Sequence, residues 1–457
     1  MLEQNLLPKL DNAELEKNFS KIKPRMTTGE ALVESSRCLF CYDAPCINSC
    51  PSSIDIPMFI RQIMSGNTKG SAKTIFTQNI LGKSCGEVCP TSVLCEGACV
   101  YNKLNEKPID IGRLQAFATG YAIDGDIRFF KKGIQTGKKV AVVGGGPASL
   151  SCAHELTVLG HDVVVFESND KAGGLNTYGV APYKFSNKDS EKEVEYISKI
   201  GFEIRTGWTV VSNTEKKSNK NQITINELEK KYDAVFLGVG LGKSSMPEFP
   251  GKDLKGVYGA TEFIHELREK EQKISVGKKV VVIGAGNTAI DAAVESSKLG
   301  ASVTVLYRRS AKEQNAYGFE VEHAKLHDIN FMYLTSPITV LGKEYVEGLK
   351  CIKNELQETK NLTKPNIKTI SGSEFIIPCD MVIFATGQEK MIDFFNSISN
   401  LKLNQGKIVT NEYFQTTNPK YFAGGDCING GKEVVNAVAH GRDAARGIDK
   451  FFKTING

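Results

Sequence analysis

Residues 38–51 read CLFCYDAPCINSCP, and residues 85–100 read CGEVCPTSVLCEGACV. Together these stretches contain eight of the twelve cysteines of the chain. Short turns between cysteines let one backbone loop present several thiolates to one iron–sulfur cluster, and a proline directly after a cysteine is typical of ferredoxin-like runs. Eight cysteines are enough ligands for two [4Fe–4S] clusters. The two stretches therefore predict a domain built around iron and sulfide.

Zinc sites and a disulfide framework are the alternatives for these cysteines. Disulfides need an oxidising compartment, and the N-terminal residues do not have the pattern of a secretory signal peptide. Zinc would take four thiolates per site, but it would leave the redox domains further along the chain without a partner for their electrons. Iron–sulfur clusters are the preferred interpretation, and the other two remain open at this point.

The length and composition indicate a multidomain protein of ordinary character. A chain of 457 residues predicts about three domains. Its 41% hydrophobic and 24% charged residues are typical of globular proteins. The net charge is +5 without a long basic block, so we expect no nucleic acid partner. No apolar stretch is long enough and free enough of charge to span a bilayer, and we expect a cytoplasmic protein.

Residues 1–137 predict a small α-helical domain. Helices are expected over residues 27–38, with Thr27 or Thr28 as the N-cap, and over residues 54–66 and 70–82, which both end at a glycine. Short helices on cysteine-rich loops have little apolar area to bury. We therefore expect the two clusters themselves to form the core of this domain.

Residues 138–160, KKVAVVGGGPASLSCAHELTVLG, predict a strand, a tight turn and a helix. Gly144 allows the turn, Gly146 lets a pyrophosphate approach the backbone, and the helix N-terminus stabilises that anion. The small Ser149 replaces the usual third glycine. The next strand ends at Glu167, 23 positions after Gly144, where a carboxylate accepts hydrogen bonds from a ribose. This unit suits FAD or an unphosphorylated NAD, and a βαβ unit without a nucleotide is the alternative.

Residues 277–310, GKKVVVIGAGNTAIDAAVESSKLGASVTVLYRRS, repeat the pattern with Gly284 and Gly286 in the turn. Here two arginines, Arg308 and Arg309, follow the second strand in place of an acid. Guanidinium groups bind a 2′-phosphate, which a carboxylate would repel. The second unit is therefore predicted to bind NADPH, with NADH as the alternative.

Two later stretches complete the nucleotide-binding part. Residues 380–388 predict a buried strand and a tight turn, and residues 418–447 place Asp426 between a strand and a helix that starts near Val434. An acid there can hold the ribityl chain of a flavin, and the helix N-terminus can stabilise negative charge on the reduced flavin. We assign both stretches to the FAD unit, so that the NAD(P)H domain is an insertion.

The predicted fold is α/β, with a helical iron–sulfur domain followed by two Rossmann-like domains. The predicted boundaries are residues 1–137 for the iron–sulfur domain, 138–248 and 376–457 for the FAD-binding domain, and 249–375 for the NAD(P)H-binding domain. Residues 354–374 are expected to form an exposed hairpin. The remaining cysteines stand singly and are interpreted as structural thiols; they are Cys152, Cys351, Cys379 and Cys427.

Six motifs identify a resemblance over nearly the whole chain. The chain resembles the electron-input half of dihydropyrimidine dehydrogenase and the small subunit of NADPH-dependent glutamate synthase. It ends without the FMN barrel and terminal ferredoxin domain of the single-chain enzymes, and so is similar to the separate bacterial subunit. The motifs are ESSRCLFCYDAPC (34–46), VCPTSVLCEGAC (88–99), PIDIGRLQ (108–115), VVGGGPAS (142–149), GAGNTAID (284–291) and FAGGDC (422–427).

This resemblance implies a ligand set for each cluster. The first cluster would be bound by Cys38, Cys41, Cys46 and Cys99. The second would be bound by Cys50, Cys89, Cys95 and a non-cysteine ligand, Gln115. Cys85 would then bind no iron, although spacing alone favours it as the eighth ligand.

The resemblance also implies the nucleotide contacts. For FAD these are Gly144, Gly146, Pro147, Ala148, Glu167, Gly174, Leu175, Lys184, Val210, Gly425, Asp426 and Val434. For NADPH they are Gly284, Ala285, Gly286, Asn287, Thr288, Arg308, Arg309, Ala385, Thr386 and Gly387.

The function implied is that of an electron-transfer subunit. Electrons would pass from NAD(P)H through FAD and two [4Fe–4S] clusters to a partner FMN subunit that reduces uracil or thymine. Gln115 and Ser149 favour this dihydropyrimidine dehydrogenase branch. The cofactors carry the chemistry, so no side chain is expected to act as a nucleophile or general acid. The alternatives are the small subunit of glutamate synthase and a stand-alone NAD(P)H:acceptor oxidoreductase.

Overall fold

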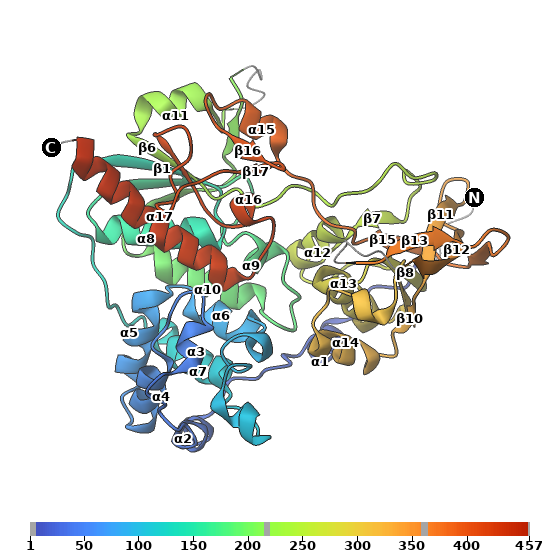
Figure 1. The fold of residues 1–457 in the computed structure, drawn as a ribbon, viewed down its shortest axis with the longest axis horizontal. Coiled ribbons are helices and arrows are strands. Elements are labelled where there is room, and N and C mark those ends of the chain that lie inside the picture. The colour runs from blue at the N-terminus through green and yellow to red at the C-terminus, as the bar shows by residue number, and fades with distance from the viewer. Residues whose placement is uncertain (1–5, 214–219, 358–363, 456–457) are drawn as a thin grey trace. The chain divides into compact units, whose positions relative to one another are not determined.

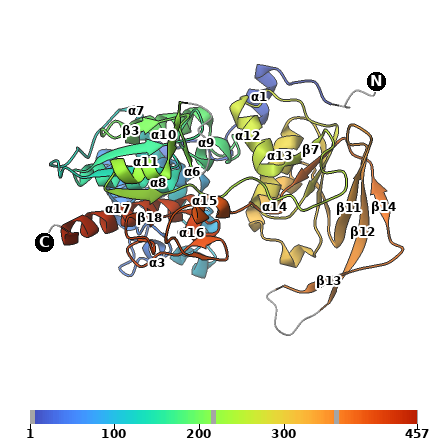
Figure 2. The same cartoon turned by 90° about the horizontal axis from the view of Figure 1, so that it is seen from above.

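The computed structural model describes residues 6–213, 220–357 and 364–455, which form two compact units (Figures 1 and 2). The smaller unit contains residues 242–389 together with the segments 6–20 and 178–183. The larger unit contains the rest: residues 21–177, 184–241 and 390 onward. Each unit is built around one parallel sheet.

The first part of the larger unit is a set of short helices. Thr27 caps the first of them: its hydroxyl accepts from the Glu30 amide at 3.2 Å, while the Glu30 carboxylate accepts from the Thr27 amide at 2.7 Å. The helices predicted around residues 28, 56 and 70 are confirmed. The elements are α2 (Thr28–Ser36), α3 (Pro45–Asn48), α4 (Ile56–Met64), α5 (Thr68–Gln78), α6 (Gly82–Val88), η1 (Thr91–Val93), η2 (Val100–Leu104) and α7 (Ile111–Asp124).

These helices have an apolar core of their own, which corrects the expectation that the clusters would replace one. Phe59 and Ile60 of α4 pack against Ile75 of α5 and against Leu114 and Phe117 of α7, and all five side chains are buried. The reason is that α7 is buried on most of its surface, not on one stripe. A helix surrounded in this way gives its short neighbours a common surface to cover.

The second part of the larger unit is a five-stranded parallel sheet in the order β18-β6-β1-β2-β3. Both faces of β1 are buried: Val140 and Val142 point to the side of α8 and α17, and Ala141 and Val143 point to the opposite side. The elements are β1 (Lys139–Val143), α8 (Pro147–Val158), β2 (Asp162–Phe166), α10 (Asn187–Ser198), β3 (Glu203–Arg205), β4 (Thr209–Val211), β5 (Gln222–Thr224), α11 (Ile225–Lys231), β6 (Ala234–Leu237), α15 (Ile392–Asn396), β16 (Leu403–Asn404), β17 (Lys407–Ile408), β18 (Tyr421–Ala423), α16 (Asp426–Asn429) and α17 (Val434–Ile455).

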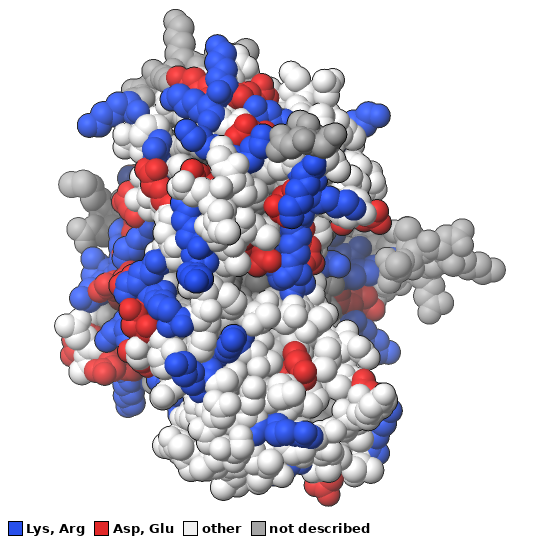
Figure 3. Space-filling model, turned by 90° about the vertical axis from the view of Figure 1, so that its left-hand side faces the viewer, with Lys and Arg blue, Asp and Glu red and all other residues white. Residues whose placement is uncertain are grey.

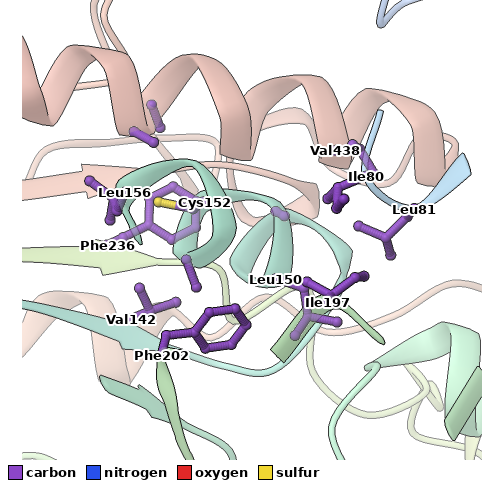
Figure 4. Packing of buried hydrophobic residues seen from close by; sticks show 14 of the residues in the cluster. Ile80, Leu81, Val142, Leu150, Cys152, Leu156, Ile197, Phe202, Phe236 and Val438 are labelled. Atoms are coloured by element: carbon purple, nitrogen blue, oxygen red, sulfur yellow. The ribbon is translucent and has the colours of Figure 1, made fainter. Parts of the chain in front are cut away.

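The core of this sheet continues into the iron–sulfur helices (Figure 4). Ile80 and Leu81, which lie between α5 and α6, belong to the same buried cluster as Leu150 of α8 and Val438 of α17. The Arg442 guanidinium of α17 donates to the Ser52 carbonyl at 3.0 Å and to the Gln78 carbonyl at 2.9 Å. The helices that carry the cysteines are therefore fixed on the flavin-type sheet by apolar packing and by buried hydrogen bonds.

The smaller unit has its own parallel sheet, in the order β10-β9-β8-β15-β7, and an antiparallel sheet of β11, β12, β13 and β14. The pairing of β12 with β13 confirms the predicted hairpin, whose residues 358–363 lie outside the described residues. The elements are α1 (Asn12–Asn18), α9 (Leu175–Tyr178), which begins in the larger unit, β7 (Val257–Gly259), α12 (Ala260–Glu269), β8 (Lys279–Ile283), α13 (Asn287–Lys298), β9 (Ser302–Leu306), η3 (Ala311–Glu313), α14 (Gly318–Lys325), β10 (Asn330–Met332), β11 (Thr335–Leu341), β12 (Gly348–Gln357), β13 (Asn366–Thr369), β14 (Phe375–Ile377) and β15 (Met381–Phe384).

The structure divides the chain at other positions than those we predicted. Strand β15 pairs with β8 and β7, so residues 380–388 belong to the NAD(P)H-type sheet and not to the FAD-type sheet. The smaller unit accordingly runs from residue 242 to 389, instead of 249 to 375. The reason is that β15 is buried on both faces and needs a strand on each side, and its apolar sequence fits a central position in either sheet.

The N-terminal segment also lies elsewhere than predicted. Residues 6–20 pack on the smaller unit and not on the helical domain. The Leu7 amide donates to the Val276 carbonyl at 2.8 Å, and the Asn18 side-chain amide donates to the Lys298 carbonyl at 2.8 Å. Leu15 and Phe19 are buried in the core of that unit. Within the described ranges, no helix combines the length and the apolar character needed to cross a membrane.

Charged side chains are distributed unevenly over the face shown in Figure 3. Lysine and arginine side chains are spread over the upper and middle parts of this face. The lower part, where Figure 1 shows the helices around α4, carries few charges. The helical domain therefore presents a largely uncharged surface to this side.

Candidate functional site

The first thiol site is a pocket lined by Cys38, Cys41, Cys46 and Cys99. Two loops and a short helix supply these cysteines: Cys38 and Cys41 follow α2, Cys46 lies in α3, and Cys99 precedes η2. The Tyr101 hydroxyl donates to the Arg37 carbonyl at 2.7 Å, which joins the loop of Cys99 to that of Cys38. Apolar side chains complete the wall, among them Ile56, Ile60, Ile109 and Ile111.

The second thiol site is a similar pocket, lined by Cys50, Cys85, Cys89, Cys95 and Gln115. The Gln115 side-chain nitrogen donates to the Gly82 carbonyl at 2.7 Å, which leaves the side-chain oxygen as the group able to bind a metal. The structure thus separates the eight predicted ligands into the two predicted sets of four. It also places Cys85 in the wall of the second pocket.

The thiols line these cavities without meeting at one point. Within the described residues, no group of three His, Cys, Asp or Glu side chains could hold a single metal ion. A cubane cluster is bound through separate irons, so each thiolate needs to reach only one corner of the cavity. The two cavities fit such a group.

Burial makes several of these thiols weak acids. It raises the pKa of Cys46 to about 12 and the pKa of Cys95 well above the ordinary value. For Cys89, the hydrogen bond with Cys85 is the larger cause of a raised pKa, and burial adds to it. These cysteines can bind as thiolates only when a strongly positive group occupies the pocket, as iron would.

Sequence reasoning missed the residue that holds α6 in place. The Glu193 carboxylate of α10 accepts from the amides of Lys83 and Ser84 at 3.0 Å each, at the start of α6. Glu193 is buried, and burial raises its pKa to about 7. Because α6 carries Cys85 and leads into Cys89, Glu193 connects the flavin-type sheet to the second thiol site. No sequence signal marks it, since it resembles any helical glutamate.

The first glycine turn has the geometry that a dinucleotide site requires. Gly144 has φ +91°, and a side chain there would lie 2.6 Å from the Gly238 carbonyl oxygen. Gly146 and Gly174 approach so closely that a Cβ on Gly174 would lie 2.7 Å from the Gly146 Cα. The helix α8 starts directly after Gly146, with Pro147 at its first position. This brings the predicted pyrophosphate contacts together.

Glu167 follows β2 and is buried beside the same turn. Its carboxylate accepts from the Gly145 amide at 2.6 Å, and from the amide and side chain of Asn169 at 2.7 and 2.9 Å. We had not singled out Gly145 or Asn169. Both contacts fix the carboxylate at the position where a ribose would bind.

The predicted flavin contacts near the C-terminus form a third edge of this site. Gly425 has φ +79°, and a Cβ there would lie 3.2 Å from that of Ala148 in α8. Burial raises the pKa of Asp426, whose carboxylate accepts from the Lys432 amide at 3.1 Å. Val434 is the first residue of α17. The remaining predicted contacts are Leu175, the first residue of α9; Lys184, which precedes α10 and is half-buried; and Val210 in β4.

The second glycine turn lies beside the turn after β15. Gly284 has φ +137°, and a Cβ there would lie 2.3 Å from the Ala385 carbonyl oxygen. The Thr386 hydroxyl donates to the Ser245 carbonyl at 2.6 Å, which fixes this turn. By contrast, a Cβ on Gly286 would meet no protein atom within 4 Å. Ala285, Asn287 and Thr288 continue the same turn into α13.

The two arginines follow β9 as predicted, but they differ in exposure. Arg308 is exposed, and Arg309 is half-buried and donates to the Pro365 carbonyl at 3.2 Å. In the described part of the chain, neither arginine has an ion-pair partner. The Asn354 side chain donates to the Arg308 carbonyl at 2.9 Å and so holds the backbone here. Both guanidinium groups thus keep donors available for an anion.

Two family models match the chain, and they divide it as the cysteines and the glycine turns do. Residues 15–127 match the 4Fe-4S cluster domain II of dihydropyrimidine dehydrogenase. Residues 138–441 match the model of pyridine nucleotide-disulphide oxidoreductases. The chain belongs to the pyridine nucleotide-disulphide oxidoreductase family. As a member of this family with an added 4Fe-4S domain, it binds FAD, NAD(P)H and [4Fe–4S] clusters, and zinc and disulfides are set aside for the cysteine stretches.

Relatives within this family match over almost their whole length. The chain is 34% identical to the glutamate synthase [NADPH] small chain of Escherichia coli K12, over 94% of this chain and 93% of that one. It is 32% identical to the NAD-dependent dihydropyrimidine dehydrogenase subunit PreT of the same strain, over 95% of this chain and 97% of that one. The predicted resemblance is confirmed: the chain is a homologue of both kinds of subunit.

Solved structures share the fold at lower identity. FprA of Mycobacterium tuberculosis, in complex with NADPH, matches with a TM-score of 0.57 and 20% identity, over 70% of this chain and 85% of that one. Thioredoxin reductase of T. acidophilum matches with a TM-score of 0.53 and 20% identity, over 70% and 99%. These likenesses confirm the predicted α/β fold of the family.

Proposed function

We propose that this chain is the electron-input subunit of a larger oxidoreductase. It would take electrons from NAD(P)H and deliver them through its clusters to a partner subunit. The observation that carries the proposal is the position of the two thiol pockets relative to the FAD-type sheet. The wall of the second pocket includes Val435 of α17, one residue after the predicted flavin contact Val434.

The second pocket would therefore receive electrons first. The Ser52 hydroxyl, two residues after Cys50, donates to the Val435 carbonyl at 3.3 Å, so the cysteine loop touches α17 directly. The first pocket is flanked by Leu39 and Tyr42, which are exposed. This order gives a route from the flavin site through the second pocket to the first pocket, and then to a partner at the exposed side.

Bound FAD would accept a hydride from NAD(P)H and release the electrons one at a time to the clusters. Glu167 and the turn at Gly144 would hold its ribose and pyrophosphate. Asp426 would hold the ribityl chain, and the first amides of α17 would stabilise negative charge on the flavin ring. The apolar walls around the thiols would keep water away from the clusters and tune their potentials.

We further infer that NADPH is the preferred donor, and that the acceptor is an FMN subunit that reduces uracil or thymine. Arg308 and Arg309 support the first inference, because their guanidinium groups are available to a 2′-phosphate. Gln115 in the second pocket supports the second inference, through the dihydropyrimidine dehydrogenase pattern noted above. The relative PreT supports it as well.

A role as the small subunit of a glutamate synthase is the second candidate. The 34% identity to a glutamate synthase small chain favours it. Co-purification distinguishes the two: a partner of modest size with bound FMN supports pyrimidine reduction, and a very large amidotransferase subunit supports glutamate synthesis. NADPH oxidation with dyes and no stable partner would point to a stand-alone reductase.

The central test is an anaerobic titration of the purified chain. Iron, sulfide and flavin are quantified, and visible and EPR spectra are recorded while NADPH is added. We expect about eight irons and one FAD per chain, flavin bleaching by NADPH, and EPR signals of reduced clusters. Zinc in place of iron, or a flavin that NADPH does not bleach, would contradict the proposal.

A further inference from the structure

A pocket of the larger unit lies apart from all the cofactor sites described above. It is formed by the segment 126–132, by α8 and by α10, and its volume is about 440 Å³. That volume lies within the range of about 300–1,000 Å³ that is typical of small-molecule sites. None of the predicted cofactor contacts lines it.

One side of this pocket is apolar and held firmly. Phe129 and Tyr196 both pack against Phe76, with ring centroids 6.1 and 5.3 Å apart. Ile80 and Ile197 extend the wall, and Figure 4 shows both at the border of the core beneath α8 and α17. The Arg128 guanidinium lies over the Tyr196 ring, 4.3 Å from its centroid, so the apolar surface open to a ligand is that of Phe129 and the isoleucines.

The rim of the pocket is basic. Arg128 is paired with Asp126, Lys199 lies 3.3 Å from the Asp126 carboxylate, and Lys132 lies 2.7 Å from that of Asp162. Lys131 differs from these three: across the described ranges, its ammonium group has no ion-pair or hydrogen-bond partner. One cation at the rim therefore remains available to an anionic group.

A buried imidazole completes the pocket. His154 of α8 lines the cavity and is only 6% exposed. Its ring meets that of Phe130 edge to face at 5.2 Å, but within the described residues it forms no hydrogen bond. Burial lowers its pKa to about 4, so at neutral pH it offers one donor and one acceptor. Its ring nitrogens are therefore able to form hydrogen bonds with a ligand that enters the cavity.

We propose that this pocket binds a small organic anion that consists of a planar ring and one carboxylate or phosphate group. The ring lies against the apolar wall and hydrogen-bonds with His154, and the anionic group meets Lys131. The segment 126–132 leads from α7, which carries Gln115, to β1. The occupant therefore lies where the iron–sulfur helices join the FAD-type sheet, which is a suitable place for an effector.

Calorimetric titration of the anaerobic holoprotein tests the proposal, with saturating NADP⁺ present to fill the nucleotide site. The probes are indole-3-carboxylate, 3-indoxyl phosphate, the neutral indole-3-carboxamide, and acetate, which lacks the ring. We expect the two ring anions to bind at least about tenfold more tightly than the carboxamide and acetate. The tighter of the two identifies the anionic group that the site prefers.

Substitutions locate the binding. Lys131→Glu and His154→Leu should each weaken the ring anions by about tenfold or more. Lys402→Glu, which reverses another exposed lysine of the same unit, should leave binding unchanged. If His154→Leu does not fold, the surface variant Lys131→Glu decides alone. Equal binding of the carboxamide, no binding of any probe, or unchanged binding in the Lys131 variant would overturn the proposal.

Discussion

Gly284 and Gly286 lie in one turn, yet the structure requires them for different reasons. A side chain on Gly284 would collide with the protein itself, at the Ala385 carbonyl. A side chain on Gly286 would meet no protein atom and would project into the space where the turn faces a nucleotide. We therefore expect the first glycine to be needed for folding and the second for binding.

This difference predicts the behaviour of Gly286→Ala. The variant should fold with a free energy of unfolding within about 1 kcal/mol of the parent, because its backbone has an ordinary φ of −96°. The KM for NADPH should rise by about tenfold or more, because the methyl group blocks the pyrophosphate. Gly318→Ala, at a position equally open, is the control, and its KM should not change. An unchanged KM in Gly286→Ala would show that the nucleotide does not approach this glycine.

We expect Arg308 and Arg309 to decide between the two nicotinamide nucleotides. In the double variant Arg308→Ala/Arg309→Ala, the KM for NADPH should rise by about tenfold or more, and that for NADH by less than about threefold. The reason is that only NADPH carries the 2′-phosphate. Lys312→Ala, an exposed cation nearby, is the control. An equal loss with both nucleotides would remove the arginines from the 2′-phosphate site.

Cys85 and Gln115 line the same pocket, and only one of them is needed as the fourth ligand. We expect Cys85→Ala to keep about eight irons per chain and both EPR signals. Gln115→Ala should lose or alter the signal of the second cluster, and Gln115→Glu, which keeps an oxygen ligand, should restore it. The reverse pattern would assign the ligand to Cys85, as the spacing of the cysteines suggested.

At the scale of elements, the junction of α6 with α10 determines how the second thiol site is held. The two amides at the start of α6 have no partner within that helix, and Glu193 supplies one. The contact gives both amides at the start of α6 a hydrogen-bond acceptor, but it buries a carboxylate. The raised pKa of Glu193 means that the folded protein binds this proton more tightly than the unfolded chain does.

Glu193 should therefore make stability depend on pH. Its contribution is fully present below the unfolded pKa of 4.5, and it is lost as pH rises to about 7, by about 3 kcal/mol at most. Glu193→Gln keeps an oxygen acceptor but cannot ionise. Its Tm relative to the parent should therefore increase between pH 5 and pH 7.5. Glu191→Gln, on the exposed face of α10, is the control, and parallel Tm profiles for Glu193→Gln and the parent would contradict the assignment.

Elements also show where sequence reasoning succeeded. The cysteine stretches, the glycine turns and Glu167 were predicted because their spacing is local, and short loops leave little freedom in how they fold. The division of the cysteines into two sets came from the family resemblance, because it joins Cys99 to cysteines far earlier in the chain. Strand β15 was assigned to the wrong sheet because its four apolar residues fit a central position in either one. The pairing of β15 with β8 decides to which sheet β15 belongs, and these two strands lie about a hundred residues apart in the chain. The hydrogen bond from the Lys279 amide to the Asp380 carboxylate, next to this pairing, spans that separation. Local pattern cannot specify such a pairing.

At the scale of the whole molecule, the order of the two pockets predicts how electrons leave. Cys41→Ala should remove the first cluster while NADPH still bleaches the flavin, and it should abolish reduction of a partner subunit. Cys95→Ala should remove the second cluster and block the same transfer one step earlier, so that NADPH no longer reduces the first cluster. EPR spectra of the two variants after NADPH addition provide the measurement. Partner reduction that survives in Cys41→Ala would place the exit elsewhere.

The whole molecule also shows what the sequence could not give. The N-terminal segment was predicted to belong to the helical domain, but Leu15 and Phe19 are buried in the other unit. Glu193 and the apolar core around α7 depend likewise on contacts between distant segments. The functional groups were predictable because chemistry restricts their residue types. The residues that hold these groups in place could not be predicted, because many residue types can pack in a core or cap a helix.

The paired ends of residues 242–389 have an evolutionary consequence. The Gly242 amide donates to the Glu389 carbonyl and the Glu389 amide to the Lys243 carbonyl, at 2.8 Å each, so this segment begins and ends at one place. A segment whose ends lie side by side can be exchanged by recombination, because the receiving chain needs no long connection to join them. A graft would have to preserve the bond from the Tyr183 hydroxyl to the Asp291 carboxylate, and the stacking of Tyr178 on His265. We therefore expect coenzyme preference to be inherited with residues 242–389, separately from the metal-binding half.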